Sequence, residues 1–97
     1  MPTYVSLINY TDQGIRNIKD SPKRLDAAKK LLKDMGGELK AVYLTMGSYD
    51  LVTVAEAPND ETVAKFVLTL ASAGNVRTVT MKAFPEAEYR KLVSTLP

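Results

Sequence analysis

The sequence predicts a protein of the α+β class, in which four strands and two main helices follow the order βαββαβ. Three observations support this prediction. The length of 97 residues suits one domain, spanning residues 1–97, with one core. Apolar residues alternate in four segments and recur at helical spacing in two others. Gly and Pro residues stand between these segments, where breaks in regular structure are expected.

The first strand and the first main helix have clear signals. A strand is predicted at residues 3–10, where both faces are largely apolar. The polar segment 11–19 allows a short helical turn. The pair Ser21-Pro22 is typical of a helix start, because a serine hydroxyl caps free N–H groups and proline has no N–H to satisfy. The helix is predicted to reach about Met35, where Gly36-Gly37 supplies a left-handed stop.

One side of this first helix is strongly basic. Lysines occur at positions 23, 29, 30 and 33, and Arg24 lies beside the first of them. We assign all five to a solvent-exposed helix face, for which solubility is a sufficient explanation. No ligand is predicted for them.

The second and third strands are predicted to form a hairpin. Alternation begins at Glu38 and continues to Leu44, and the third strand is expected at residues 49–57. Between them, the pair Gly47-Ser48 suits a two-residue turn of type II′, which has glycine at its first position. Pro58 is expected to end the third strand, because it cannot donate to the ladder.

The remaining elements are a helix, a strand and a terminal helix. Asn59 is expected to cap a helix that ends at Gly74, and the fourth strand is predicted at residues 76–83. The apolar face of that strand consists of Val79, Met81 and Ala83. Its other face is mixed and consists of Thr78, Thr80 and Lys82. Pro85 opens a last helix, whose apolar stripe is Tyr89, Leu92, Val93 and Leu96. This stripe can dock on its own subunit or on a neighbour.

Right-handed crossovers fold this order into a four-stranded antiparallel sheet with both main helices on one face, the ferredoxin-like arrangement. The other face is left uncovered. Tyrosines, threonines and aliphatic side chains are expected there, as a patch that a monomer of this size rarely exposes. We therefore expect a second copy to stack on this face, as a homodimer or a dimer-based higher oligomer.

Composition excludes several kinds of chemistry. The sequence has no Cys and no His. Disulfides, thiolate catalysis, the commonest metal ligand and the usual proton-transfer group near neutral pH are therefore missing. We expect neither a metal nor another cofactor.

Charge and hydropathy bear on the class of partner. The net charge of +2 is far from the concentrated basic field of nucleic-acid binders, and the third strand carries one Tyr and no basic residue where an RNA recognition motif has stacking aromatics. No apolar run reaches the roughly 20 residues that span a bilayer, and the start of the chain lacks a signal-peptide pattern. We expect no nucleic acid, no membrane and a cytoplasmic location.

Several segments resemble the GYD domain family. They are GSYD at the predicted turn, LVTVAEAPND after it, GNVRTVTMKAF in the fourth strand and INYTDQGIRNIKDSPKR near the start. The residues that name the family stand here as Gly47, Tyr49 and Asp50. The resemblance covers nearly the whole chain and implies a dimeric α+β barrel. That group includes small cofactor-free monooxygenases, isomerases and effector-binding modules of bacterial regulators.

The Gly-x-Tyr-Asp motif has two interpretations. In the structural one, Gly47 adopts a positive φ, Tyr49 packs and Asp50 accepts backbone hydrogen bonds near the turn. In the functional one, Tyr49 and Asp50 reach a pocket between sheet and helices, where burial raises the carboxyl pKa.

Four further residues are candidates for ligand binding: Asn9, Tyr10, Tyr43 and Arg77. The tyrosines and the asparagine offer polar groups to an apolar cleft, and the arginine can bind a carboxylate or phosphate. The alternatives are core or interface packing for the tyrosines and a structural ion pair for Arg77. We prefer these alternatives.

The sequence thus predicts a homo-oligomeric protein that binds a small apolar ligand or serves a regulatory or assembly partner. The other candidate is a cofactor-free enzyme of the antibiotic-monooxygenase or isomerase type. Such an enzyme would have Tyr49, Asp50 and Asn9 to work with, but its support is analogy of fold.

Overall fold

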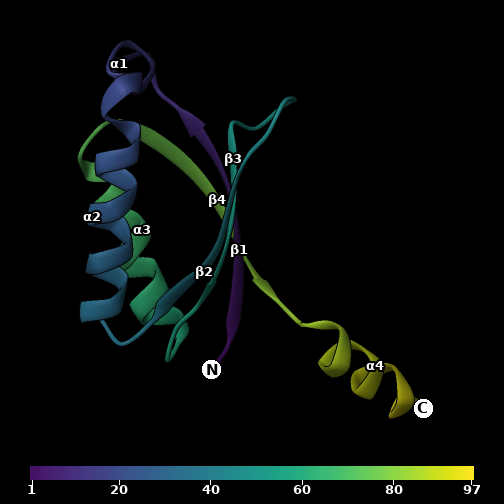
Figure 1. Cartoon of the computed structure of the whole chain (residues 1–97). Helices are drawn as coiled ribbons and strands as arrows, with labels where there is room; N and C mark the ends of the chain where they lie inside the picture. Colours follow the sequence, from purple (N-terminus) through teal and green to yellow (C-terminus); the bar gives the residue numbers. More distant parts are fainter.

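The computed structural model describes residues 1–97 and contains one four-stranded antiparallel sheet in the order β2-β3-β1-β4 (Figure 1). Its strands are β1 (Thr3–Tyr10), β2 (Glu38–Leu44), β3 (Leu51–Glu56) and β4 (Val76–Ala83). The helices are α1 (Asp12–Arg16), α2 (Ser21–Asp34), α3 (Asp60–Ser72) and α4 (Glu86–Ser94), with a 3-10 turn, η1, at Ile18–Asp20. The predicted ferredoxin-like order with a terminal helix is confirmed.

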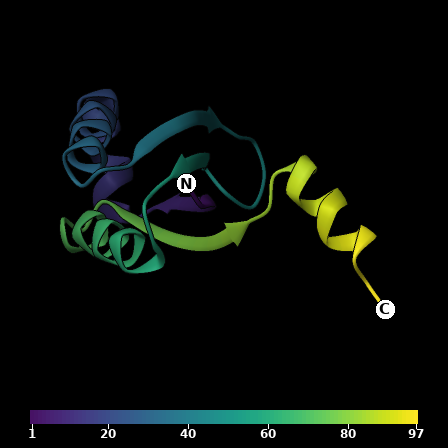
Figure 2. The same ribbon diagram turned by 90° about the horizontal axis from the view of Figure 1, so that it is seen from below.

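Both main helices lie on one face of the sheet, side by side (Figure 2). The opposite face carries no helix. None of the helices combines the length and the apolar character that crossing a membrane requires.

Local signals set most helix ends, with one correction. Asn59 caps α3 as predicted, because its side-chain oxygen accepts a hydrogen bond from the Thr62 N–H at 2.9 Å. Gly36 has a φ of 91° at the end of α2. The prediction that Ser21 caps α2 is wrong: η1 leads directly into the helix, so Ser21 already has helical backbone angles. Its hydroxyl instead bonds the Tyr10 hydroxyl at 2.7 Å.

The connection between β2 and β3 is wider than the predicted two-residue turn at Gly47-Ser48. It is the loop 45–50, in which the Thr45 N–H donates to the Asp50 carbonyl at 2.8 Å. The Thr45 hydroxyl also donates to the Tyr49 carbonyl at 2.5 Å. These two bonds close a longer loop, and so the short turn predicted from the Gly-Ser pair alone does not form.

The two faces of the sheet carry different side chains. Ser6 pairs with both Thr53 and Thr80, so a row of hydroxyls crosses the face under α2 and α3. The open face carries mainly aliphatic side chains: Val5, Leu7, Ala41, Val52, Val54, Val79 and Met81. We expected tyrosines, threonines and aliphatic side chains on the open face. The aliphatic side chains are there, but Tyr43 is the only strand tyrosine on that face, and Thr53, Thr78 and Thr80 lie on the covered face. Periodicity separates two faces, but only the register shows which of them the helices cover.

The terminal helix α4 extends away from the rest of the chain (Figures 1 and 2). The Cα radius of gyration is 14.6 Å, whereas a compact domain of this length has about 12.5 Å. No residue of α4 is buried. Its predicted apolar stripe is exposed to solvent: Tyr89, Leu92, Val93 and Leu96. This stripe is available to a partner surface.

The buried core is small. Only 9 of the 97 residues are buried, and Leu32 is the one large side chain that is fully so. A buried cluster of Tyr4, Ala57 and Val63 lies near the start of α3. Many apolar side chains are therefore not fully buried, and they lie around a cavity and on the open face of the sheet.

Candidate functional site

A cavity of about 320 Å³ lies between the sheet and helices α2 and α3. Its volume is at the lower end of the range for small-molecule sites. Of its 21 lining residues, 14 are hydrophobic, which makes it suited to an apolar molecule. Ala27 and Ala28 on α2 and Ala73 after α3 are among the lining residues. These small side chains leave space that larger ones would occupy.

Polar groups reach the floor of the cavity from three strands. They are the hydroxyls of Ser6, Thr53 and Thr78. The Ser6 hydroxyl shares a hydrogen bond of 2.8 Å with Thr80. Thr53 is only 7% exposed, but its hydroxyl has no hydrogen-bond partner in the chain and is not sealed off from the cavity. Because this hydroxyl faces the cavity and is not used by the chain, Thr53 marks a place where a polar ligand atom can form a hydrogen bond.

A second polar group of residues lies at the end of the cavity near the start of α2. It consists of Tyr10, Ser21 and Arg24. The Arg24 guanidinium is held by main-chain carbonyls, donating from Nη1 to Asn17 at 2.9 Å and from Nη2 to Gly14 at 3.3 Å. None of the five ion pairs in the chain includes Arg24. This end of the cavity therefore carries a positive charge that no acidic side chain neutralises.

Of the six candidate ligand-binding residues, only Tyr10 lines the cavity. Asp50 bonds the main chain of β1: its Oδ2 accepts from the Tyr10 N–H at 2.9 Å, and its own N–H donates to the Ile8 carbonyl at 2.9 Å. These bonds are of the kind that the structural interpretation of the motif predicts. Tyr49 belongs to the loop and does not line the cavity.

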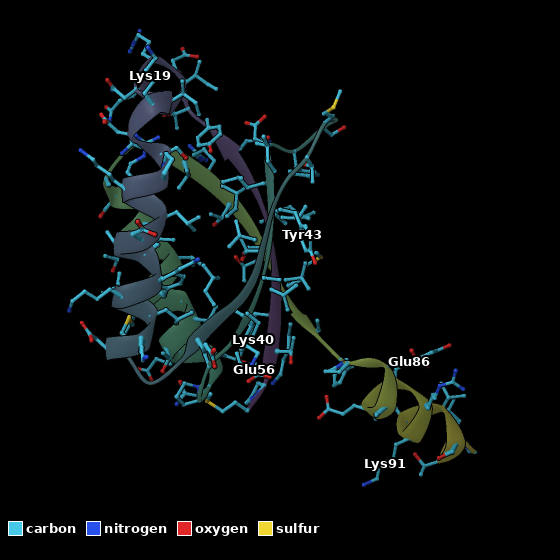
Figure 3. All side chains as sticks on the ribbon, in the orientation of Figure 1. Lys19, Lys40, Tyr43, Glu56, Glu86 and Lys91 are labelled. Carbon is cyan, nitrogen blue, oxygen red and sulfur yellow. The ribbon has the colours of Figure 1, made fainter.

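Asn9, Tyr43 and Arg77 belong to the open face. Asn9 and Arg77 are cross-strand partners, so the structure brings these two together. Tyr43 is 60% exposed and points away from the helices (Figure 3). The structural ion pair preferred for Arg77 is wrong, since no acidic side chain pairs with it. Arg77 lies near the start of β4 on the open face, where its cross-strand neighbour on β1 is the uncharged Asn9.

Of the two polar groups in the cavity, only Tyr10 was among the candidates predicted from the sequence. Arg24 was predicted on the solvated face of the first helix, but its side chain is half-buried over the cavity end. The reason is that Arg24 precedes Leu25 at the start of the apolar stripe, and its long side chain turns toward the main chain of α1. Thr53 lies among apolar residues of the predicted third strand, and this was the signal in the sequence that could have identified it as a polar group facing the cavity.

A separate trio joins β1, β4 and the start of α3. The Tyr4 hydroxyl donates a short hydrogen bond to Asp60, and the Lys82 ammonium lies 3.4 Å from the same carboxylate. Burial, then the hydrogen bond and the charge of Asp60, raise the pKa of Tyr4 to about 12. Hydrogen bonds from Tyr4 and then Lys82 hold the pKa of Asp60 below its ordinary value. A carboxylate with a lowered pKa is a weak base, which makes it unsuited to proton abstraction. The contacts of the trio instead link the start of α3 to β1 and β4.

No three Asp, Glu, His or Cys side chains converge as a group that could hold a metal ion. Tyr10 and Arg24 are the only ionisable side chains that line the cavity. They offer hydrogen-bond donors and a positive charge, which suits recognition of an anionic group better than proton abstraction.

The fold defines a ferredoxin-like α+β protein with an uncovered sheet face. The GYD domain family matches residues 4–93. The chain belongs to this family. A protein of Thermus thermophilus, named glutamine synthetase and cystathionine beta-lyase binding protein, is 39% identical over 89 residues. The match covers 91% of this chain and 94% of that protein.

Solved structures share the fold. The feast or famine regulatory protein of M. tuberculosis, complexed with L-methionine, superposes with a TM-score of 0.66 at 15% identity, covering 88% of this chain and 51% of that one. The chain thus spans about half the length of that regulator. A solved structure from Thermus thermophilus superposes with a TM-score of 0.56 at 25% identity, covering 88% of this chain and 95% of that one.

Proposed function

We propose that this chain is a homo-oligomeric binding protein with a regulatory role, in which two copies stack their open sheet faces and the assembly engages metabolic enzymes in the cytoplasm. The observation that carries the proposal is the uncovered aliphatic face of the sheet. The name of the 39% identical relative, which describes binding to glutamine synthetase and cystathionine beta-lyase, supports enzymes as the partners.

The open face has the properties of a surface that another protein covers. Strand β1 is central, but Val5 and Leu7 on this face are only half-buried. On the edge strand β4, Val79 is 49% and Met81 is 44% exposed. Stacking a second sheet here removes apolar surface from water, which favours the assembly. The proposed assembly is therefore a homodimer or a higher oligomer built from dimers.

The projecting helix α4 suits the same assembly. Its exposed apolar stripe has no cover within the chain. In a pair of stacked sheets, α4 reaches past its own sheet and packs its stripe on the second copy. The small buried core is consistent with this arrangement, since partner contacts supply burial that the single chain lacks.

The oligomer is tested by sedimentation velocity of the purified protein and of Val79→Glu. We expect an even-numbered assembly for the unmodified chain and monomers for the variant, because a carboxylate is costly to bury in an apolar interface. Leu68→Glu is the matched control: Leu68 is 69% exposed on α3, away from the open face, and this variant should assemble normally. A monomeric unmodified chain would overturn the paired-sheet proposal.

Binding to an enzyme partner is tested with the assembled protein and with purified glutamine synthetase from the organism that produces this protein. Biolayer interferometry should show saturable binding that Val79→Glu weakens. Absence of binding by a properly assembled protein would remove enzymes of this kind as partners while leaving the oligomer in place.

The cofactor-free enzyme is not favoured by a specific observation. Tyr49, Asp50 and Asn9 do not line the cavity, and no carboxylate or lysine does so either. Catalysis there would therefore depend on the substrate's own reactivity.

A further inference from the structure

We propose that the cavity under α2 and α3 binds an elongated apolar carboxylic acid, with its carboxylate at Arg24 and a second hydrogen-bonding group deeper inside, at Thr53. This goes beyond the proposed oligomer and partner enzymes and does not depend on them, since ligand binding and assembly are measured separately.

The apolar lining and the volume define the body of the ligand. With about 320 Å³, the cavity lies at the lower end of the range of small-molecule sites. Leu25, Leu31, Val67 and Leu70 stand among the helix residues that line it. A small, slender chain or ring system suits this space.

Arg24 defines the anionic end. Two of its N–H groups are engaged by the Asn17 and Gly14 carbonyls, which hold the guanidinium in place without neutralising it. A guanidinium has five donors, so others stay free for a carboxylate. The hydroxyls of Tyr10 and Ser21 lie at the same end and share a 2.7 Å hydrogen bond with each other, which leaves donor capacity for an anion.

Thr53 defines the second polar end of the ligand. The residue is 7% exposed, lines the cavity and has no partner for its hydroxyl. Thr53 pairs with Ser6, which stands four positions before Tyr10 on β1. Four residues of strand span about 13 Å. A ligand that satisfies both places is therefore long and narrow, with polar groups at its two ends.

Isothermal titration calorimetry of the full chain with three probes tests the proposal: octanoate, octanol and ω-hydroxyoctanoate. We expect octanoate to bind more tightly than octanol, because only the acid meets the Arg24 charge. The ω-hydroxy acid should bind more tightly than octanoate, because its hydroxyl reaches Thr53, and equal binding would overturn the assignment of Thr53 to the site. Failure of all three probes to bind would overturn the proposal.

Three substitutions locate the two ends and the body of the ligand. Arg24→Gln should weaken octanoate about tenfold and leave octanol unchanged, whereas Lys23→Gln, an exposed neighbour on α2, should change neither. Thr53→Val keeps the side-chain shape and should remove any advantage of the ω-hydroxy acid over octanoate. Ala28→Phe should abolish binding of all probes by filling the cavity.

Each result decides between this cavity and another site. Equal losses for octanoate in Arg24→Gln and Lys23→Gln, or unchanged binding in a folded Ala28→Phe variant, would place the probes elsewhere and overturn the cavity site. If Ala28→Phe does not fold, the contrast between acid and alcohol in Arg24→Gln still decides. Circular dichroism checks folding, and sedimentation velocity checks assembly in parallel.

Discussion

The two faces of the sheet are both largely apolar, but they differ in what covers them. The face under the helices holds the buried Tyr4 and Ile8 beside a row of hydroxyls from Ser6, Thr53 and Thr80. The uncovered face carries valines, a leucine and a methionine that stay half-buried or exposed. A monomer of this size rarely leaves such a face open. The comparison indicates that the open face suits a second sheet, whereas the mixed lining of the covered face suits an apolar ligand with polar ends.

The largest effect on stability is expected for Leu32→Ala. This side chain of α2 is fully buried, and its truncation should lower the free energy of unfolding by about 2–5 kcal/mol. Urea denaturation measures this loss. The matched control is Leu68→Ala on the exposed side of α3, which should change stability by less than about 0.5 kcal/mol. Equal losses in both variants would show that the packed side of the helices is misassigned.

The open face should respond differently to truncation. Val79 is 49% exposed in the single chain, and the proposed oligomer would bury it. On that proposal, we expect Val79→Ala to have little effect on unfolding at low protein concentration and a larger effect at high concentration. Thermal melts over a concentration series measure this dependence. A loss of stability that does not vary with protein concentration would show that Val79 packs within the single chain, and would contradict the proposed difference between the two faces.

The role of Asp50 is tested at the end of β1. Asp50→Ala leaves the Tyr10 N–H without its acceptor and should cost about 1–3 kcal/mol of stability, whereas Asp50→Asn keeps an oxygen there and should restore much of it. Binding of octanoate by the folded variants should be unchanged. Loss of binding at normal stability would instead favour the functional interpretation of the Gly-x-Tyr-Asp motif.

A smaller effect is expected for Tyr4→Phe on the covered face. The variant loses the hydrogen bond to Asp60, and the cost in stability should be smaller than that of Asp50→Ala, because the Asp60 carboxylate is largely exposed to solvent. The matched variant Tyr43→Phe, on the open face, has no such bond to lose. A comparable cost for Tyr43→Phe would contradict the assignment.

The same hydrogen bond has a defined pH window. Asp60 has a lowered pKa in the folded chain, so its contribution is present above the carboxyl's ordinary pKa and is lost as the pH falls through the lowered one. Tyr4 has a raised pKa, so its contribution is present below pH 10 and is lost as the pH rises toward about 12. The stability difference between the unmodified chain and Tyr4→Phe should therefore be largest in between. A difference that persists in acid would exclude Asp60 as the partner.

The sequence predicted the elements that depend on neighbouring residues. The Asn59 cap, the Gly36 stop and the order βαββαβ follow from hydrogen-bonding capacity and backbone freedom within a few positions, and the structure agrees with each. The predicted Ser21 cap and Gly47-Ser48 turn were wrong because the preceding and flanking residues extend the local structure. The turn η1 runs into α2, so Ser21 is already helical, and Thr45 closes the wider loop.

By itself, the sequence determined the ferredoxin-like fold, the membership of the GYD domain family and the absence of cysteine and histidine chemistry. These follow from periodicity, motif and composition. Only the tertiary structure decided which face of the sheet the helices cover, that a cavity remains beneath them, and that Arg24 and Thr53 line it. Side chains from α2 and β3 meet there through strand pairing across long stretches of sequence, and no local pattern encodes that register.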